Sequence, residues 1–283
     1  MSLEPPGLGV VGLGRMAQAL LEPWISDQLI APEAVRAVVG SEASRDRWAN
    51  ATLAGHALRV STDPREAWQA PLVLLAVKPQ QLEAVATTAS LADIPGDPSS
   101  GEAPSSPRLL LSVLAGVRLD RLRGLFPSRT CVRAVVNTPA LVRHGLTALA
   151  WADSPSPEVR QRVEGLFRRV GEVWTLPESQ LDAFLALTAS GPAFVALVAE
   201  ALADGAVAAG LPRALAQPLA LRTLGGTVAL LEQKDLHPGQ LKDMVSSPGG
   251  TTMAGLRELE RAGLRSALLE AVLAAAERSQ ALA

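Results

Sequence analysis

The segment from Ser246 to Thr252 contains the residue types of an anion-binding turn. It reads Ser-Ser-Pro-Gly-Gly-Thr-Thr and runs into a helical pattern that begins at Met253. Glycines let the backbone approach a ligand closely. The free N–H groups of a first helical turn, with the positive end of the helix dipole, favour a carboxylate or a phosphate. A plain helix start, with Ser247 or Thr251 as N-cap, explains the same residues, so this segment alone leaves both interpretations open.

A second glycine-rich segment, Gly12 to Ala17, follows the short apolar run Leu8 to Val11. This order predicts the strand, turn and helix of a dinucleotide-binding fold. In such a fold Gly12 makes the tight turn, Gly14 lets a pyrophosphate approach the backbone, and the small Ala17 allows the helix to pack closely on the strand.

The residues after a further apolar run, Val35 to Val39, bear on the choice of cofactor. An acidic residue at this place binds the ribose 2′-hydroxyl of NAD, whereas an arginine accommodates the 2′-phosphate of NADP. This chain has Ser41, Ser44 and Arg45 there, and also Glu42. We therefore expect NADP as cofactor with NADPH favoured, and Glu42 keeps NAD possible.

Polar or turn-forming segments follow three more predicted strands. Because carboxyl ends of parallel strands meet at one sheet edge, where α/β folds bind ligands, these segments predict a cleft beside a nicotinamide ring. Lys78 is the one cation among them, and a solvated lysine explains it equally well. The full set of expected cofactor contacts is Gly12, Gly14, Arg15, Met16, Ala17, Ser41, Ser44, Arg45, Ala76, Val77, Lys78, Pro79, Ala115 and Asn137.

Short apolar runs alternate with helical stretches in the first part of the chain, which predicts an α/β Rossmann-like domain with a parallel-dominated sheet. Residues 93–107 are rich in Pro, Ser and Gly and are expected to form a mobile surface loop. The expected strands are 8–11, 35–39, 72–77, 109–113, 131–135 and 146–150, followed by a helix at 158–170 and an edge strand at 173–174.

After Pro177 the pattern changes to Ala and Leu at helical spacing, which predicts an all-α domain. We expect a dinucleotide-binding domain at residues 1–177 and a helical substrate-binding and dimerisation domain at 178–283. The helices carry few charges and are apolar on more than one face, so a homodimer that packs them together is the economical explanation. A compact monomer whose helices cover each other stays open.

Composition excludes several classes of partner. The chain has 48% hydrophobic residues and a formal charge of −2, without the basic stripe of a nucleic-acid-binding protein. A single cysteine, Cys131, fits a reducing cytoplasm and an inert core position. Three histidines without ligand spacing predict no metal site. No membrane segment is expected, because charged residues interrupt the apolar helices: Glu200, Asp204, Arg213 and Arg222.

Five blocks of the chain, in order, resemble the pyrroline-5-carboxylate reductase family, whose members make proline from a cyclic imine. The blocks are residues 12–17, 76–80, 137–140, 189–194 and 241–252. The resemblance implies active sites completed near a dimer interface, with dimers sometimes stacked into larger rings. It also implies that Ser247 and the N–H groups of Gly249, Gly250 and Thr251 bind the substrate carboxylate. Thr252 would lie near the ring nitrogen, and Thr252 and Lys78 are the expected catalytic residues.

This chemistry requires few catalytic groups, because a protonated cyclic imine accepts hydride readily and the site must mainly orient the reactants. Three departures from the family pattern, Pro64, Val136 and His144, bear on loop shape and adenosine contacts. Two alternatives remain. One is another imine or 2-hydroxyacid reductase of the same plan, with Lys234 or Lys242 as proton donor. The other is a nucleotide-binding regulator without turnover.

Overall fold

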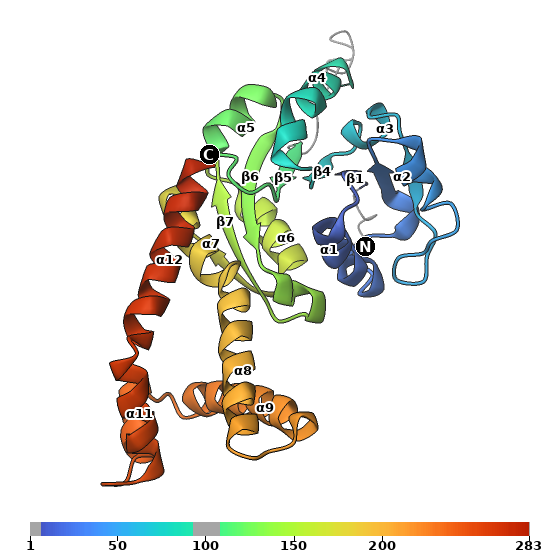
Figure 1. Cartoon of the computed structure of the whole chain (residues 1–283). Helices are drawn as coiled ribbons and strands as arrows, with labels where there is room; N and C mark the ends of the chain where they lie inside the picture. Colours follow the sequence, from blue (N-terminus) through green and yellow to red (C-terminus); the bar gives the residue numbers. More distant parts are fainter. Residues whose placement is uncertain (1–6, 93–107, 283) are drawn as a thin grey trace. The chain divides into compact units, whose positions relative to one another are not determined.

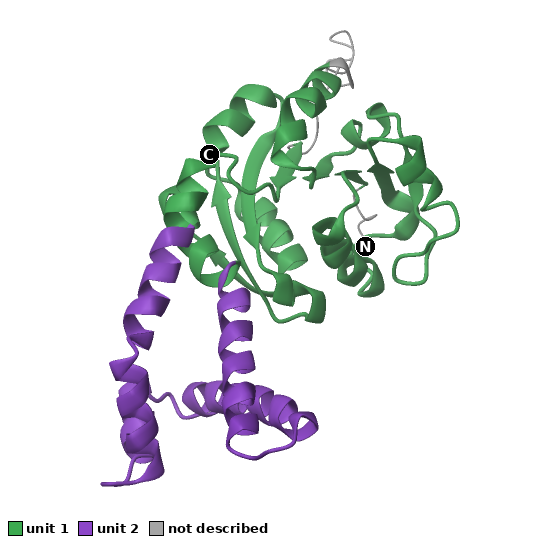
Figure 2. Cartoon of the chain, in the orientation of Figure 1, with its two compact units in different colours: residues 1–189, 276–283 green, residues 190–275 purple. Residues whose placement is uncertain are grey.

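The computed structural model describes residues 7–92 and 108–282. The chain divides into two compact units: residues 1–189 with 276–283, and residues 190–275 (Figure 2). The first unit contains the β-sheet and the second is helical. The loop predicted at 93–107 lies outside the described residues, and the domain boundary at 177 stays a prediction.

The first unit is built on an eight-stranded sheet of the described residues, in the order β3-β2-β1-β4-β5-β6-β7-β8. All neighbouring strands are parallel except β6 and β7, which are antiparallel. The strands are β1 (Leu8–Val11), β2 (Val35–Val38), β3 (Arg59–Ser61), β4 (Leu72–Leu75), β5 (Leu109–Ser112), β6 (Thr130–Val136), β7 (Gly145–Trp151) and β8 (Gly171–Thr175). The predicted parallel-dominated, Rossmann-like sheet is confirmed. Strand β3 was not predicted, because its three residues form no apolar run.

Strands β1, β4 and β5 are buried along their whole length, as parallel strands covered on both faces must be. One face packs against α1 (Arg15–Ser26) and α6 (Pro157–Phe167), where Trp24 meets Phe167 edge to face at 5.8 Å. The opposite face packs against a second set of helices (Figure 1). These are α3 (Arg65–Trp68), α4 (Leu82–Ala92), α5 (Leu119–Leu125) and α7 (Leu181–Thr188).

Short helical segments join these elements at the sheet edges. One of them, α2 (Glu42–Asp46), follows β2. The others are 3-10 turns: η1 (Pro32–Ala34), η2 (Pro79–Gln81), η4 (Thr138–Val142) and η5 (Glu178–Gln180).

The second unit consists of helices, as the Ala- and Leu-rich pattern predicted. They are α8 (Gly191–Ala208), α9 (Arg213–Gln233), α10 (Pro238–Met244), α11 (Thr251–Arg261) and the larger part of α12 (Leu264–Ala281). Helices α8 and α9 pack through a small cluster of alanines, Ala203, Ala216 and Ala220. Small side chains let the two helices approach closely but bury little apolar area.

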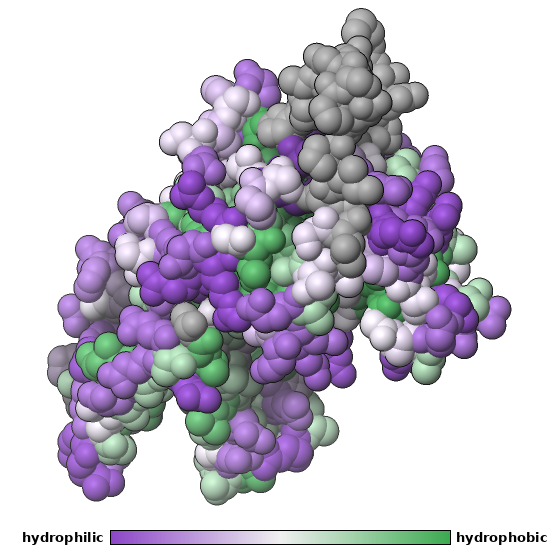
Figure 3. Space-filling view, turned by 90° about the horizontal axis from the view of Figure 1, so that it is seen from above, coloured by the Kyte–Doolittle hydropathy of each residue, from purple (hydrophilic) through white to green (hydrophobic). Residues whose placement is uncertain are grey.

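Many large apolar side chains of the helical unit are therefore exposed in the single chain, and Figure 3 shows apolar residues among polar ones on one face of the molecule. Examples from α8 and α9 are Val195, Leu197, Leu202, Leu215, Leu219, Leu221 and Val228. By length and composition alone, Glu178–Ala208 and Arg213–Gln233 are also apolar enough to cross a membrane. The sequence argument that charged residues break these segments before they reach the length of a membrane span is therefore wrong.

Candidate active site

The turn after β1 brings the backbone of Gly12 against the end of β4. Gly12 has φ +91°, and its N–H donates to the carbonyl oxygen of Val38 at 2.9 Å. A Cβ atom there would lie 2.7 Å from the carbonyl oxygen of Ala76 and 2.9 Å from Cγ1 of Val77. Both the positive φ and the close approach require glycine. This agrees with the tight turn that was predicted at Gly12.

Helix α1 starts directly behind this turn, with Gly14 as a N-cap residue that has no side chain to close the helix end. A Cβ atom at Gly14 would meet no protein atom within 4 Å, so nothing crowds the backbone at this residue. The first hydrogen bond runs from the Gln18 N–H to the Gly14 carbonyl at 3.0 Å, which leaves the N–H groups of Arg15, Met16 and Ala17 ahead of the helical ladder. This end of the helix fits a pyrophosphate. The Ala17 side chain is fully buried and packs the helix onto the sheet.

At the end of β2, the side chains of Ser41 and Ser44 form a small hydroxyl cluster. The Ser41 Oγ caps α2 by accepting from the Ser44 N–H at 3.3 Å, and the two hydroxyl oxygens are 3.0 Å apart. Arg45 is ion-paired with Glu42 and with Asp46, and hydrogen bonding to Asp46 raises the pKa of its guanidinium. The structure thus brings together the predicted adenosine-side residues.

The ends of β4 and β5 lie at the same sheet edge as Gly12, because β1, β4 and β5 are parallel. Lys78 is exposed and caps the turn η2, where its N–H donates to Oε1 of Gln81 at 3.2 Å. Pro79 begins that turn, and Ala115 is exposed in the loop after β5. Lys78 and Ala115 are therefore accessible at the sheet edge where the cofactor is predicted to bind.

Asn137 directly follows β6 and is only 4% exposed. Its Oδ1 accepts from the Leu146 N–H at 2.7 Å, and its Nδ2 donates to the Thr188 carbonyl at 3.1 Å. The side chain therefore ties the end of β6 to β7 and to the last turn of α7. Its assignment as a cofactor contact stays a prediction. Such a contact would use the second N–H of the side-chain amide.

In the helical unit, Ser247 to Gly250 form a tight turn directly before α11. The Gly250 N–H donates to the Ser247 carbonyl at 3.0 Å, and Gly249 at the third position has φ +69°. Pro248 followed by a residue with positive φ is the sequence and geometry of a type II turn. A Cβ atom at Gly249 would meet nothing within 4 Å, so the turn presents bare backbone to the space beside it.

Helix α11 begins at Thr251, and its N-cap Gly250 offers no side-chain hydrogen bond. The Ala254 N–H makes the first helical bond, to the Gly250 carbonyl at 3.2 Å. The N–H groups of residues 251–253 therefore lie ahead of the ladder and point out of the helix start. Neither Ser247 nor Thr251 caps the helix with its side chain. The interpretation of this segment as an ordinary capped helix start is therefore wrong.

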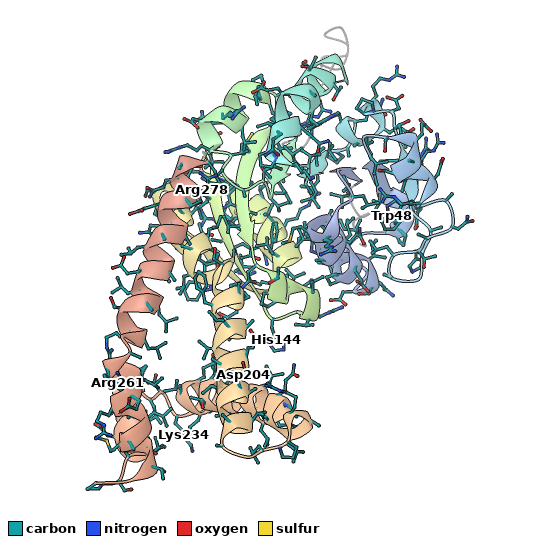
Figure 4. The ribbon with its side chains drawn as sticks, in the orientation of Figure 1. Trp48, His144, Asp204, Lys234, Arg261 and Arg278 are labelled. Carbon is teal, nitrogen blue, oxygen red and sulfur yellow. The ribbon has the colours of Figure 1, made fainter. Side chains whose placement is uncertain are left out.

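The three departures from the family pattern have ordinary structural places. Pro64 is the N-cap of α3, Val136 is a buried residue at the end of β6, and His144 is exposed after η4. Lys234 is the C-cap of α9, where Figure 4 labels it, and Lys242 lies in the last turn of α10.

Sequence reasoning missed a polar cluster made by Arg133 of β6 with Glu178 of η5 and Asp182 of α7. Arg133 is 2% exposed within β6 and lies near Glu178 and Asp182. The signal was present, since Arg133 is the only charged residue in the apolar run 131–136.

A Rossmann-like sheet has a glycine turn and an uncapped helix start at its edge, and the helical unit has a second uncapped helix start after a glycine turn. These features are typical of dinucleotide-dependent oxidoreductases of the two-domain class. Residues 7–96 match the family model described as NADP oxidoreductase, coenzyme F420-dependent, and residues 178–282 match the model of pyrroline-5-carboxylate reductase dimerisation. NADP as cofactor and the helical dimerisation domain are thereby confirmed.

Relatives cover nearly the whole chain. The pyrroline-5-carboxylate reductase of Synechocystis sp. is 45% identical over 277 residues, covering 97% of both chains, and that of Methanosarcina acetivorans is 35% identical over 99% of both. The crystal structure of Plasmodium falciparum pyrroline carboxylate reductase with NADP bound superposes with a TM-score of 0.83 at 28% identity, covering 99% of both chains. The chain belongs to the pyrroline-5-carboxylate reductase family.

Proposed function

We propose that the chain reduces 1-pyrroline-5-carboxylate to L-proline, the last step of proline biosynthesis. The full-length relatives support the reaction. The observation that carries the substrate assignment is the type II turn before α11, whose bare backbone and unpaired helix-start N–H groups suit a small carboxylate.

Each half of the reaction has its own set of residues in this proposal. Ser247 and the N–H groups of Gly249 and Thr251 hold the carboxylate, and Thr252 places its hydroxyl near the ring nitrogen. The Gly250 N–H, expected from the sequence to join them, instead closes the turn by donating to the Ser247 carbonyl. The cofactor lies along Gly12 to Ala17 and the strand ends at Ala76 to Pro79, Ala115 and Asn137, with the hydroxyl groups of Ser41 and Ser44 toward the adenosine. Reduced NADP supplies the hydride when bound. Lys78 is the second candidate catalytic residue, at the exposed end of β4.

The work of the protein side chains in this reaction is orientation and not strong acid catalysis. A cyclic imine is already protonated near neutral pH, so the carboxylate turn needs only to fix the ring. The Thr252 hydroxyl donates a hydrogen bond to the nitrogen as it becomes an amine, which requires no shifted pKa.

The test is a spectrophotometric assay with purified protein. Addition of the cyclic imine is expected to oxidise NADPH, and proline at high pH is expected to reduce NADP in reverse. Absence of both reactions, with binding of NADPH intact, would leave the regulator hypothesis standing. For the hydroxyacid-reductase alternative, Lys234→Met and Lys242→Met are the test, because loss of turnover in one of them would mark a lysine proton donor.

The dimerisation domain supports a homodimer, and the exposed apolar side chains of α8 and α9 are the surface that a second copy would cover. Larger homo-oligomers and a cytoplasmic location remain part of the proposal. Sedimentation velocity would determine the size of the assembly.

A further inference from the structure

Two arginines follow β2, and their surroundings differ. Arg45 contacts two carboxylates: its Nη2 lies 2.8 Å from Oδ1 of Asp46, and its Nη1 pairs with Glu42. An anion that approaches Arg45 therefore also meets two negative groups. The charge of this arginine is largely balanced before any ligand arrives.

Arg47, two residues further on, contacts a neutral group instead. Its Nη2 donates to the Ser44 Oγ at 2.9 Å, and among residues 7–92 and 108–282 no ion pair to Arg47 is found. Trp48, which follows it directly, is half-buried against the core and labelled in Figure 4. A guanidinium has five N–H donors, so four remain for a ligand.

The hydroxyl groups beside Arg47 extend this donor set. Ser44 Oγ lies within hydrogen-bonding distance of both Arg47 and Ser41, with the Ser41 hydroxyl donating to it. Because Ser44 then accepts twice, its own hydrogen is available to donate to an anion. A planar guanidinium next to a donating hydroxyl suits a phosphate group.

Glu42, the acidic residue that would otherwise select NAD, is held by other partners. Its Oε1 accepts from the Thr62 hydroxyl at 2.8 Å, and its Oε2 pairs with Arg45. These contacts use one acceptor site on each oxygen and fix the position of the carboxylate. Arg45 and Thr62 together hold the competing group in place.

We propose that Arg47, with Ser44 beside it, binds the ribose 2′-phosphate of NADPH and sets the cofactor preference, while Arg45 serves to hold Glu42. The inference rests on the proposed function only for the identity of the cofactor. It assigns the phosphate contact to a residue outside the glycine turn and the strand ends described above.

The experiment compares equilibrium binding of NADPH and NADH to the full-length protein, followed by fluorescence of the reduced nicotinamide, so that no imine is needed. The variants are R47A, R47K and R45A, with R160A as a control that removes an exposed arginine from α6. R47A is expected to raise the Kd for NADPH about tenfold or more and that for NADH less than about twofold, because only NADPH carries the phosphate. R47K is expected to lie between R47A and the unmodified chain.

R45A is expected to keep the Kd for NADPH within about threefold, as for other exposed ion pairs, and R160A to leave both values unchanged. The proposal is overturned if R45A weakens NADPH as much as R47A does, if R47A weakens both cofactors equally, or if R160A has the same effect. Selective binding of NADPH without reduction of the imine would contradict the proposed reaction but would still support Arg47 as the phosphate contact.

Discussion

Arg133, buried in the middle of β6, forms an ion pair with the half-buried Glu178 in the first turn of the segment that leads into the helices. Arg133 Nη1 donates to Glu178 Oε1 at 3.0 Å, and the same oxygen accepts from the Leu119 N–H at 2.7 Å. Asp182 lies 3.7 Å from the guanidinium and accepts from the Ser279 hydroxyl at 2.7 Å. Arg133, Glu178 and Asp182 together connect the sheet with α5, α7 and the end of α12.

Removal of one partner from this pair is expected to be costly. Glu178→Ala leaves the Arg133 charge in the core and the Leu119 N–H without its acceptor, so we expect the free energy of unfolding to fall by about 3 kcal/mol. Urea unfolding followed by circular dichroism measures it. The matched control is Glu83→Ala, which breaks the exposed pair with Arg121 and is expected to cost less than about 1 kcal/mol. Equal losses in the two variants would contradict the importance of the buried pair.

The glycine turn offers a pair of substitutions that separate folding from cofactor binding. Gly12→Ala places a methyl group at φ +91° and against the Ala76 carbonyl, and it is expected to destabilise the fold by about 2 kcal/mol. Gly14→Ala meets no protein atom, so the melting temperature should be nearly unchanged while the Kd for NADPH rises about tenfold or more. Calorimetric melting and NADPH titration give the two readouts. Unimpaired NADPH binding by Gly14→Ala would remove the pyrophosphate from this helix start.

Thr252 lies at the start of α11, beside the proposed carboxylate turn. Thr252→Ala is expected to lower kcat/KM for the imine by about 10- to 100-fold, because a hydrogen bond to a nitrogen that changes charge is lost. The Kd for NADPH should not change. Thr252→Ser keeps the hydroxyl and should recover most of the activity. Steady-state kinetics with fixed NADPH would decide, and an unimpaired Ala variant would exclude Thr252 from the site.

The exposed leucines of the helical unit should report on self-association. Leu197 and Leu221 are 66% and 57% exposed in the single chain. If a second copy covers them, the double variant Leu197→Glu/Leu221→Glu buries two carboxylates and should sediment as a monomer. Leu141→Glu, at a leucine that is 65% exposed outside the dimerisation region, is the control and should sediment like the unmodified chain.

Cys131 is buried in β6, and burial raises the pKa of its thiol from the ordinary 9.0 to about 11. The folded chain therefore keeps a proton that the unfolded chain loses. This contribution to stability is complete below about pH 9 and is lost as the pH rises toward 11. Urea unfolding at several pH values should show a steeper decline for the unmodified chain than for Cys131→Val. Parallel declines would contradict the shifted pKa.

Much of the fold could be predicted because the controlling signals are local. Buried parallel strands such as β1 and β4 are continuous apolar runs, and the glycines at 12 and 249 stand where positive φ is required. Strand β3 escaped prediction because an edge strand of three residues needs no apolar pattern. Its place is set by pairing with β2, which is a tertiary effect.

The candidate site was less predictable where side-chain partners decide a role. The sequence places Arg45 and Arg47 two residues apart with the same chemistry, and only the structure shows that one faces carboxylates and the other a serine hydroxyl. The same holds for Asn137, whose amide oxygen and nitrogen bind backbone groups 9 and 51 residues away in the sequence.

The first compact unit takes in residues 276–283 from the far end of the chain, after the whole helical unit has been traversed. During synthesis this unit therefore gains its final helical turn only after residues 190–275 have been made. A nascent chain halted at residue 189 lacks Ser279, the hydrogen-bond partner of Asp182. Such a chain should be digested by proteases faster than the same residues within the finished protein.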